Sequence, residues 1–181
     1  MQPIATDPPF FHTARRPDLH EVFMDASLIK PFMESTRAVF STMLKSEVSF
    51  GRPRMIDSLP RFDVSAIIGM SGDVVGAVVL SLPSDVAWKV VQRFAGMPFE
   101  VESADFADAI GEIVNMISGG AKAKFNNKSV SINCPSVSIG RNHIIPRPSN
   151  TPCISIPCKT QFGDFSIDVS IRPVQFAKAA A

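Results

Sequence analysis

The sequence lacks the features that mark membrane-spanning and nucleic-acid-binding proteins. No apolar stretch approaches the roughly 20 residues that cross a bilayer, and the N-terminus does not show the basic and then apolar pattern of a signal peptide. Eighteen basic against seventeen acidic side chains give a formal charge of +1, and no run of five basic residues occurs. These absences predict a cytoplasmic protein that binds neither membranes nor nucleic acid.

Cysteine and histidine are also scarce. Cys134, Cys153 and Cys158 stand in strand-like sequence without Cys-x-x-Cys spacing, which predicts reduced thiols in the core. The three histidines lack the short spacings of a zinc site, and we expect His143 to shape a loop. The sequence therefore predicts no metal and no other cofactor of the chain's own.

What the sequence does contain fits one folded domain. With 181 residues, of which 45% are hydrophobic and 19% charged, the chain can bury a sizeable core. Residues 1–24 are rich in proline, and we expect them to form a flexible N-terminal arm. The predicted domain then spans residues 25–176, and residues 177–181 form a C-terminal tail.

Apolar periodicity predicts the elements of this domain. Long helices are expected at 25–44 and 104–126, a shorter helix at 84–96, and strands at 64–70, 74–82, 130–138, 151–160 and 165–172. We expect Asp25 and Ser84 to cap helices, and the pairs Gly72-Asp73 and Gly163-Asp164 to form hairpin turns. The element order predicts a mixed α/β domain of the α+β type, with two long helices packed on a mainly antiparallel sheet.

The second long helix carries a stripe of polar residues along one side. Steps of four and three residues return to the same side of a helix, so Asp108, Glu112 and Asn115 lie together, and Gly119 and Lys122 continue the line. Apolar residues occupy the opposite side. Such a stripe is either a solvated surface or a binding site, and spacing alone does not separate these interpretations.

Glycines inside this helix favour the binding site. Gly111, Gly119 and Gly120 each cost about 0.5–1 kcal/mol relative to alanine in a helix interior. We therefore expect something to approach the helix closely. At Gly119 the missing side chain leaves room for another protein beside Asn115.

The two halves of the chain share an order of elements, a long helix followed by strands that end in a hairpin. This order indicates an internal duplication, or a coincidence between two similar units. Aligning the helices by their glutamates sets Glu34 opposite Glu112 and Arg37 opposite Asn115. The first helix thus has the carboxylate without the carboxamide, which predicts one working site per chain.

These residues resemble a known family pattern. Asp108, Glu112, Asn115 and Pro135 match the signature of the CheC-type chemotaxis phosphatases, and most closely their CheX branch. The runs 67–76, 111–122 and 140–143 are also similar to that family. The interval from Asn115 to Pro135 is shorter than usual, which places a small deletion in the turn after the helix. The resemblance covers about residues 26–175.

The resemblance implies a fold and an activity. Family members have pseudo-twofold symmetry and remove the phosphoryl group from the aspartyl phosphate of a CheY-like response regulator. The resemblance implies that Asn115 orients the attacking water and that Glu112 pairs with a lysine of the regulator. The regulator also supplies Mg²⁺. A homodimer formed through the sheets is implied too. Asp108, Gly119 and Lys122 are further candidates for contact with the partner.

A second function remains open on the sequence alone. Flagellar switch components share this architecture and need only bind a phosphorylated regulator, so the alternative is a non-catalytic module that binds or sequesters it. Asn115 favours hydrolysis, because a binding protein does not require a carboxamide at that position. We expect Pro135, which has no backbone donor, to end strand pairing beside the site.

Overall fold

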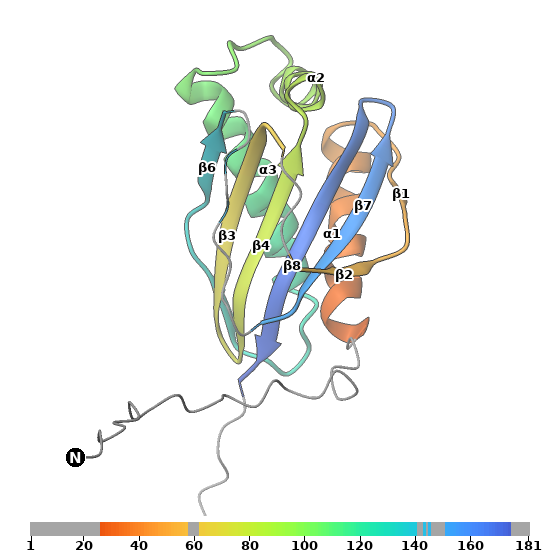
Figure 1. The fold of residues 1–181 in the computed structure, drawn as a ribbon, viewed down its shortest axis with the longest axis vertical. Helices are drawn as coiled ribbons and strands as arrows, with labels where there is room; N and C mark the ends of the chain where they lie inside the picture. Colours follow the sequence, from red (N-terminus) through yellow and green to blue (C-terminus); the bar gives the residue numbers. More distant parts are fainter. Residues whose placement is uncertain (1–25, 58–61, 141–142, 144, 146–150, 175–181) are drawn as a thin grey trace, which may run out of the picture.

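A computed structural model describes residues 26–57, 62–140, 143, 145 and 151–174 (Figure 1). The predicted arm at 1–24, the tail at 177–181 and the cap at Asp25 lie outside these residues. The helices are α1 (Ala26–Met43), α2 (Ser84–Ala95) and α3 (Ala104–Lys122). The strands are β1 (Ser49–Phe50), β2 (Arg54–Ile56), β3 (Val64–Gly72), β4 (Val74–Leu82), β5 (Val130–Ile132), β6 (Ser136–Ile139), β7 (Cys153–Thr160) and β8 (Gly163–Pro173).

The strands form a single antiparallel sheet in which equivalent strands of the two halves of the chain take equivalent positions, one counted from each edge. Along the sheet the order is β1-β7-β8-β4-β3-β5, with β2 also on β7 and β6 also on β3. The central pair, β8 and β4, contributes one strand from each half of the chain. The short strands of each half pair with the long hairpin of the other half. This symmetry confirms the pseudo-twofold fold and agrees with the proposed internal duplication.

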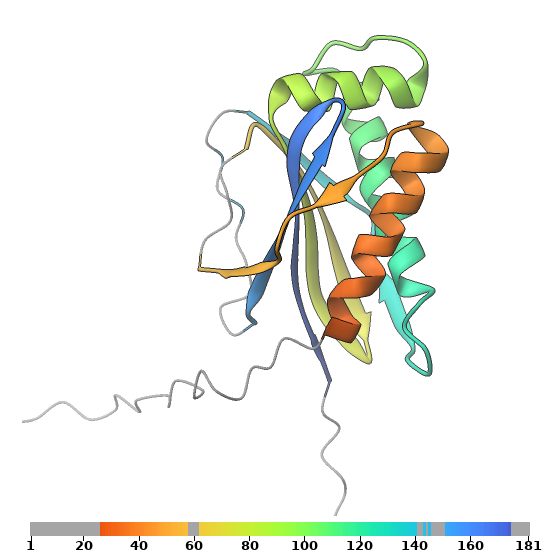
Figure 2. The same ribbon diagram turned by 90° about the vertical axis from the view of Figure 1, so that its right-hand side faces the viewer.

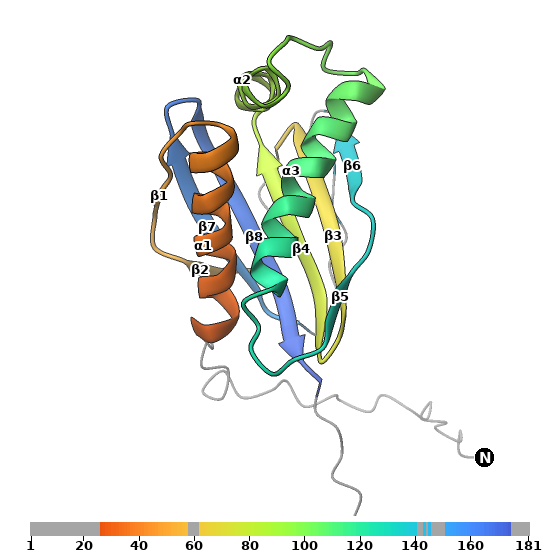
Figure 3. The ribbon, with the colours of Figure 1, turned by 180° about the vertical axis from the view of Figure 1, so that it is seen from behind.

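The helices cover one face of this sheet (Figures 2 and 3). α1 and α3 lie side by side along the strands, and α2 crosses the end of the sheet. Between the helices and the sheet lies a core of fully buried apolar side chains, in which Phe40 stacks on Phe165 with ring centroids 4.9 Å apart. Burying each such side chain contributes about 1.5–3 kcal/mol. No helix in the described part of the chain is both long and apolar enough to cross a membrane.

The other face of the sheet is polar and yet buried. Side chains alternate along each strand, and the face away from the helices carries Ser65, Ser81, Ser166 and Asp168, each at most 4% exposed. His143 contributes to this layer, because its Nε2 lies 2.9 Å from the Ser65 Oγ and its Nδ1 lies 2.8 Å from the Gly140 carbonyl oxygen. His143 therefore shapes the loop after β6, as the sequence indicated.

Several predicted details of the elements are wrong. Pro83 is the N-cap of α2, and Ser84 makes no side-chain cap; its N–H instead donates to Asp63 Oδ2 at 3.2 Å. α3 ends at Lys122, four residues before the predicted end at Asn126. The Gly163-Asp164 pair begins β8 instead of forming the turn.

The strands also differ from the prediction in two places. The span predicted as one strand, 130–138, is broken into β5 and β6 at residues 133–135. Pro135 lies in this break, which confirms its expected effect on strand pairing. The short strands β1 and β2 carry too few residues to show a period of two, and the sequence did not predict them.

Candidate functional site

The stripe is positioned by α3, whose start is fixed by Ser103. The Ser103 Oγ accepts a hydrogen bond from the Phe106 N–H at 3.2 Å, which satisfies one of the free donors of the first turn. Phe106, Ile110 and Ile113 are fully buried on the inner face of the helix. Core packing therefore fixes the rotation of α3 and directs the stripe outward.

Glu112 and Asn115 meet at the middle of the stripe. Glu112 is exposed and Asn115 is half-buried. The Asn115 Nδ2 donates to the Glu112 Oε2 at 3.4 Å, one helical turn away. Among the described residues no group donates to the Asn115 Oδ1, so this oxygen is free to accept a hydrogen from water. The pair thus gives the carboxamide a preferred orientation.

Asp108 and Lys122 occupy the two ends of the stripe. Both are exposed. Fourteen residues of helix separate them by about 21 Å, so Asp108 and Lys122 do not pair with each other. Neither residue forms an ion pair with any other residue that the structure describes.

The glycines of α3 have two different explanations. A Cβ at Gly111 would lie 3.2 Å from the Pro135 Cγ, and one at Gly120 would run into the Ser35 Oγ on α1. The close approach predicted for these two positions is therefore internal to the fold. At Gly119 a Cβ would have no atom within 4 Å, so the glycine leaves open space beside Asn115.

The corresponding face of α1 is occupied. Glu34 lies 2.9 Å from Lys124 and 3.7 Å from Lys30, and the hydrogen bond from Lys124 lowers the pKa of its carboxyl. The Arg37 guanidinium sits 5.1 Å from the centre of the Phe50 ring. Both side chains thus have charged or aromatic partners within the chain, whereas Glu112 forms no ion pair with any residue that the structure describes.

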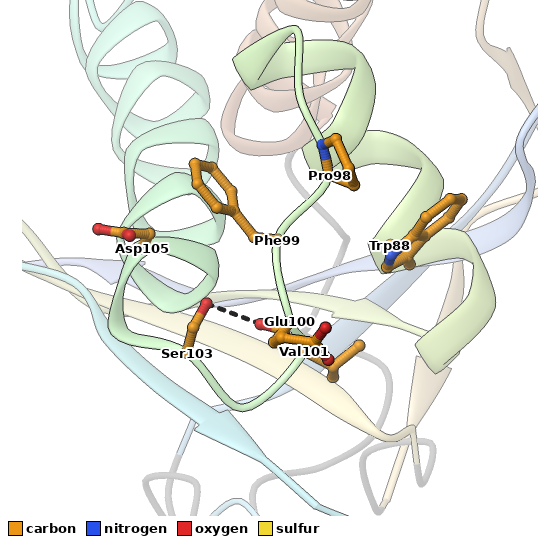
Figure 4. A pocket seen from close by; sticks show the side chains of 7 residues that line it. All are labelled: Trp88, Pro98, Phe99, Glu100, Val101, Ser103 and Asp105. Carbon is orange, nitrogen blue, oxygen red and sulfur yellow. Dashed lines mark hydrogen bonds between the residues drawn. The ribbon is translucent and has the colours of Figure 1, made fainter.

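Hollows open at both ends of α3. The first, the Trp88 hollow, measures about 460 Å³ and lies between α2 and the start of α3 (Figure 4). Its lining consists of Trp88, Pro98, Phe99, Glu100, Val101, Ser103 and Asp105. Figure 4 shows the Phe99 ring turned toward α3, with Trp88 on the opposite side. Trp88 is the chain's single tryptophan and is 38% exposed. Its helical spacing in the sequence did not indicate that it lines a hollow.

The second, the Lys128 hollow, measures about 630 Å³ and lies at the end of α3 beside β5. It is lined by Gly119, Lys122, Ala123, Lys128, Ser129, Val130, Ser131 and Ile132. Gly119 and Lys122 belong to the stripe, so this hollow is continuous with it. The sequence did not indicate Lys128, because the turn that brings it beside α3 has no recognisable pattern.

The cysteines have mixed environments. Cys153 and Cys158 are buried, and burial raises the pKa of the Cys158 thiol to about 12, which keeps it protonated. Cys134 is exposed beside Pro135, so the prediction of a core thiol is wrong there. In the described part of the chain, no three side chains of His, Cys, Asp or Glu converge to hold a metal ion.

A pseudo-twofold antiparallel sheet, with paired helices on one face, is the fold of CheC-like chemotaxis proteins. The family model described as "Chemotaxis phosphatase CheX" matches residues 64–159, more than half of the chain. The chain therefore belongs to the CheX family.

Individual relatives agree with this assignment. The CheY-P phosphatase CheX of Thermotoga maritima is 28% identical over 123 residues, which cover 66% of this chain and 79% of the relative. The crystal structure of a chemotaxis protein CheX from Desulfovibrio desulfuricans is 31% identical, with a TM-score of 0.74 over 81% of this chain and 99% of that one. A CheX in a CheX–CheY–BeF₃–Mg²⁺ complex from Borrelia burgdorferi has the same fold, with a TM-score of 0.68, 19% identity, and coverage of 80% and 97%.

Proposed function

We propose that this protein hydrolyses the aspartyl phosphate of a CheY-like response regulator, with Asn115 orienting the attacking water and Glu112 pairing with a lysine of the regulator. The observation that carries the proposal is the Glu112–Asn115 pair on the outer face of α3, one turn from the open space at Gly119. Because an added Cβ at Gly119 would meet no atom within 4 Å, a receiver domain, the phosphorylated part of the regulator, has room to approach the helix there.

The geometry of Asn115 suits water positioning. Its Nδ2 is directed to Glu112, and its Oδ1 can accept one hydrogen of a water molecule. Transfer of a phosphoryl group passes through a loose transition state, so holding the water in line contributes more than covalent chemistry from the protein. A carboxamide fixes the direction of attack without taking up a proton.

Glu112 supplies the charge that recognises the receiver. Its carboxylate is exposed and has no ion-pair partner within the described chain. A lysine ammonium from the receiver can therefore pair with it when the two proteins meet. We expect Mg²⁺ to be bound by the receiver, where it neutralises charge that develops on the phosphoryl oxygens.

The relatives support the choice of partner. The Thermotoga maritima relative carries the name CheY-P phosphatase, and the Borrelia burgdorferi structure contains a CheX with a CheY. We place the protein in the cytoplasm with its receiver. We also propose a homodimer formed through an edge of the sheet, because exposed edge strands can pair with a second copy of the chain.

One experiment separates hydrolysis from sequestration. A radiolabelled phosphoreceiver is followed with this protein at a small fraction of the receiver concentration, with Mg²⁺ present. We expect the phosphate to disappear faster than by the receiver's own decay, and each protein molecule to act on many receivers. Binding of the receiver without faster decay would replace this proposal with the non-catalytic binding module.

A further inference from the structure

The charges along the outer face of α3 are separated by sign. Asp105, Asp108 and Glu112 are exposed in the first half of the helix, and Lys122 is exposed at its end. Lys128 continues the positive end beyond the helix. Asn115 and Gly119 lie between the two groups. A protein bound over Asn115 therefore faces negative charge on one side and positive charge on the other.

The positive end is a shallow, open hollow. Two lysines, two serines and Gly119 line the Lys128 hollow, and no carboxylate does. Neither Lys122 nor Lys128 forms an ion pair within the part of the chain that the structure describes, whereas nearby Lys124 is held by Glu34. Both ammonium groups are thus free for an anionic partner.

The wall of the hollow is held in place before any partner binds. The Ser129 N–H donates to the Asp73 Oδ2 at 2.7 Å, and the Asp73 N–H donates to the Ser129 carbonyl oxygen at 2.8 Å. Gly72, at a φ of 100°, lies so close to the Ser129 carbonyl that a side chain would clash with it. These contacts hold the backbone next to Lys128 in place, so little backbone entropy is lost when a partner binds there.

We propose that the Lys128 hollow is a second docking point for the receiver, and that it takes up carboxylate side chains of the receiver's surface. This inference rests on the proposed function, because it assumes that a receiver docks over Asn115. The hollow shares Gly119 with the stripe, about 6 Å of helix rise from Asn115. A protein interface of ordinary size, about 800 Å² per partner, covers both. The opposed charges at the two ends then fix the direction in which the receiver lies along α3.

The test compares charge reversals at two exposed basic positions. Lys128→Glu changes the hollow, and Arg52→Glu makes the same change between β1 and β2, at the opposite edge of the sheet. For Lys128→Glu we expect the KM for the phosphoreceiver to rise about three- to tenfold while kcat stays near the wild-type value, because charge pairs at an interface act on association. Arg52→Glu should leave both constants unchanged, and Lys128→Gln should shift KM in the same direction by less.

A salt titration gives a second readout. The wild-type KM should rise with ionic strength, and the Lys128→Glu KM should rise less steeply, since part of the screened attraction is already lost. Equal KM values for Lys128→Glu and Arg52→Glu would overturn the proposal. A changed oligomeric state in Lys128→Glu, with unchanged KM, would assign the hollow to a second copy of this chain and overturn it too.

Affinity can also be measured without turnover. Titration of the receiver loaded with beryllium fluoride and Mg²⁺ should give a weaker Kd for Lys128→Glu than for the wild type. If the wild type does not accelerate phosphate loss, the proposed phosphatase activity fails while this affinity comparison still decides the docking point. An unchanged Kd with intact wild-type turnover refutes the docking point alone.

Discussion

The Nζ of Lys124 lies 2.9 Å from the Oε2 of Glu34, and this ion pair occupies the only carboxylate of α1. In the sequence repeat that carboxylate corresponds to Glu112, which has no such partner in the described chain. The two halves of the chain therefore contain two similar helices, and only the glutamate of α3 is without an ion-pair partner in the described chain. The two helices thus differ in the surroundings of their glutamates. They also differ in that α1 has Arg37 at the position that corresponds to Asn115 of α3.

A carboxamide at position 37 should consequently not create a second site. We predict that Asn115→Ala/Arg37→Asn remains as inactive toward the phosphoreceiver as Asn115→Ala alone, because Glu34 stays paired with Lys124 and Lys30. Turnover is compared between the two variants by the same decay measurement. Recovery of activity in the double variant would show that residue identity alone decides which helix works.

The glycines of α3 should respond to alanine in opposite ways. Gly119→Ala should raise the free energy of unfolding by about 0.5–1 kcal/mol, because the methyl group meets no atom and helix propensity improves. Gly120→Ala should lower it by about 1–3 kcal/mol, since the methyl group is forced against Ser35. Urea denaturation measures both.

A larger side chain at the open glycine should act on binding instead. Gly119→Leu places bulk beside Asn115 where an added Cβ meets no atom within 4 Å, so we expect thermal stability at least equal to that of the wild type and a higher KM for the phosphoreceiver. An unchanged KM would mean that the receiver does not approach this part of the helix.

Asp168 should make stability depend on pH. It is 1% exposed, and its burial raises the pKa of its carboxyl, an effect that hydrogen bonds from Ser155, Ser166 and Ser81 partly offset. A pKa above the unfolded value near 3.8 means that the fold favours the protonated form. The stabilisation of the fold by protonated Asp168 is fully present below the unfolded pKa. It is lost as the pH rises through the higher pKa of the folded state.

Asp168→Asn should therefore be more stable than the wild type at pH 7, and this difference should disappear as pH is lowered toward 4. Asp164→Asn, at an exposed position of the same strand, serves as the control and should show no such trend. Thermal unfolding at a series of pH values measures the effect. A stability difference that does not change with pH would contradict the assigned ionisation.

The cysteines should differ in reactivity. We predict that a disulfide reagent modifies one thiol per folded chain, Cys134, and all three after denaturation, because Cys153 and Cys158 are buried. The high pKa of Cys158 leaves almost no thiolate at neutral pH. Modification of a second thiol in the folded protein would show that the sheet opens locally.

The long elements could be predicted because their patterns are strong. α3 buries one face, on which apolar residues recur at the period of a helix, and β3 and β4 are continuous apolar runs rich in β-branched residues. The short strands β1 and β2 depend on backbone pairing with β7, which no local pattern records. The break at Pro135 was foreseen as an effect on pairing, although the division of one strand into two was not.

The site was predictable in part for similar reasons. Helical spacing places Glu112 and Asn115 together, and their hydrogen bond agrees with that placement. Spacing does not reveal that Gly120 serves the contact with α1 while Gly119 is open, since this depends on the neighbouring helix. The same is true of Lys128, which reaches the stripe only through the turn that Asp73 holds.

The central claim is that Asn115 orients the attacking water, and its most direct measurement is the single-turnover rate of phosphate loss from a phosphoreceiver mixed with a saturating excess of this protein. Asn115→Ala is compared with Asn126→Ala, which removes an exposed carboxamide just beyond the end of α3. We predict that Asn115→Ala lowers the rate about a hundredfold or more with unchanged receiver affinity, and that Asn126→Ala keeps the wild-type rate. A wild-type rate in Asn115→Ala would contradict the account.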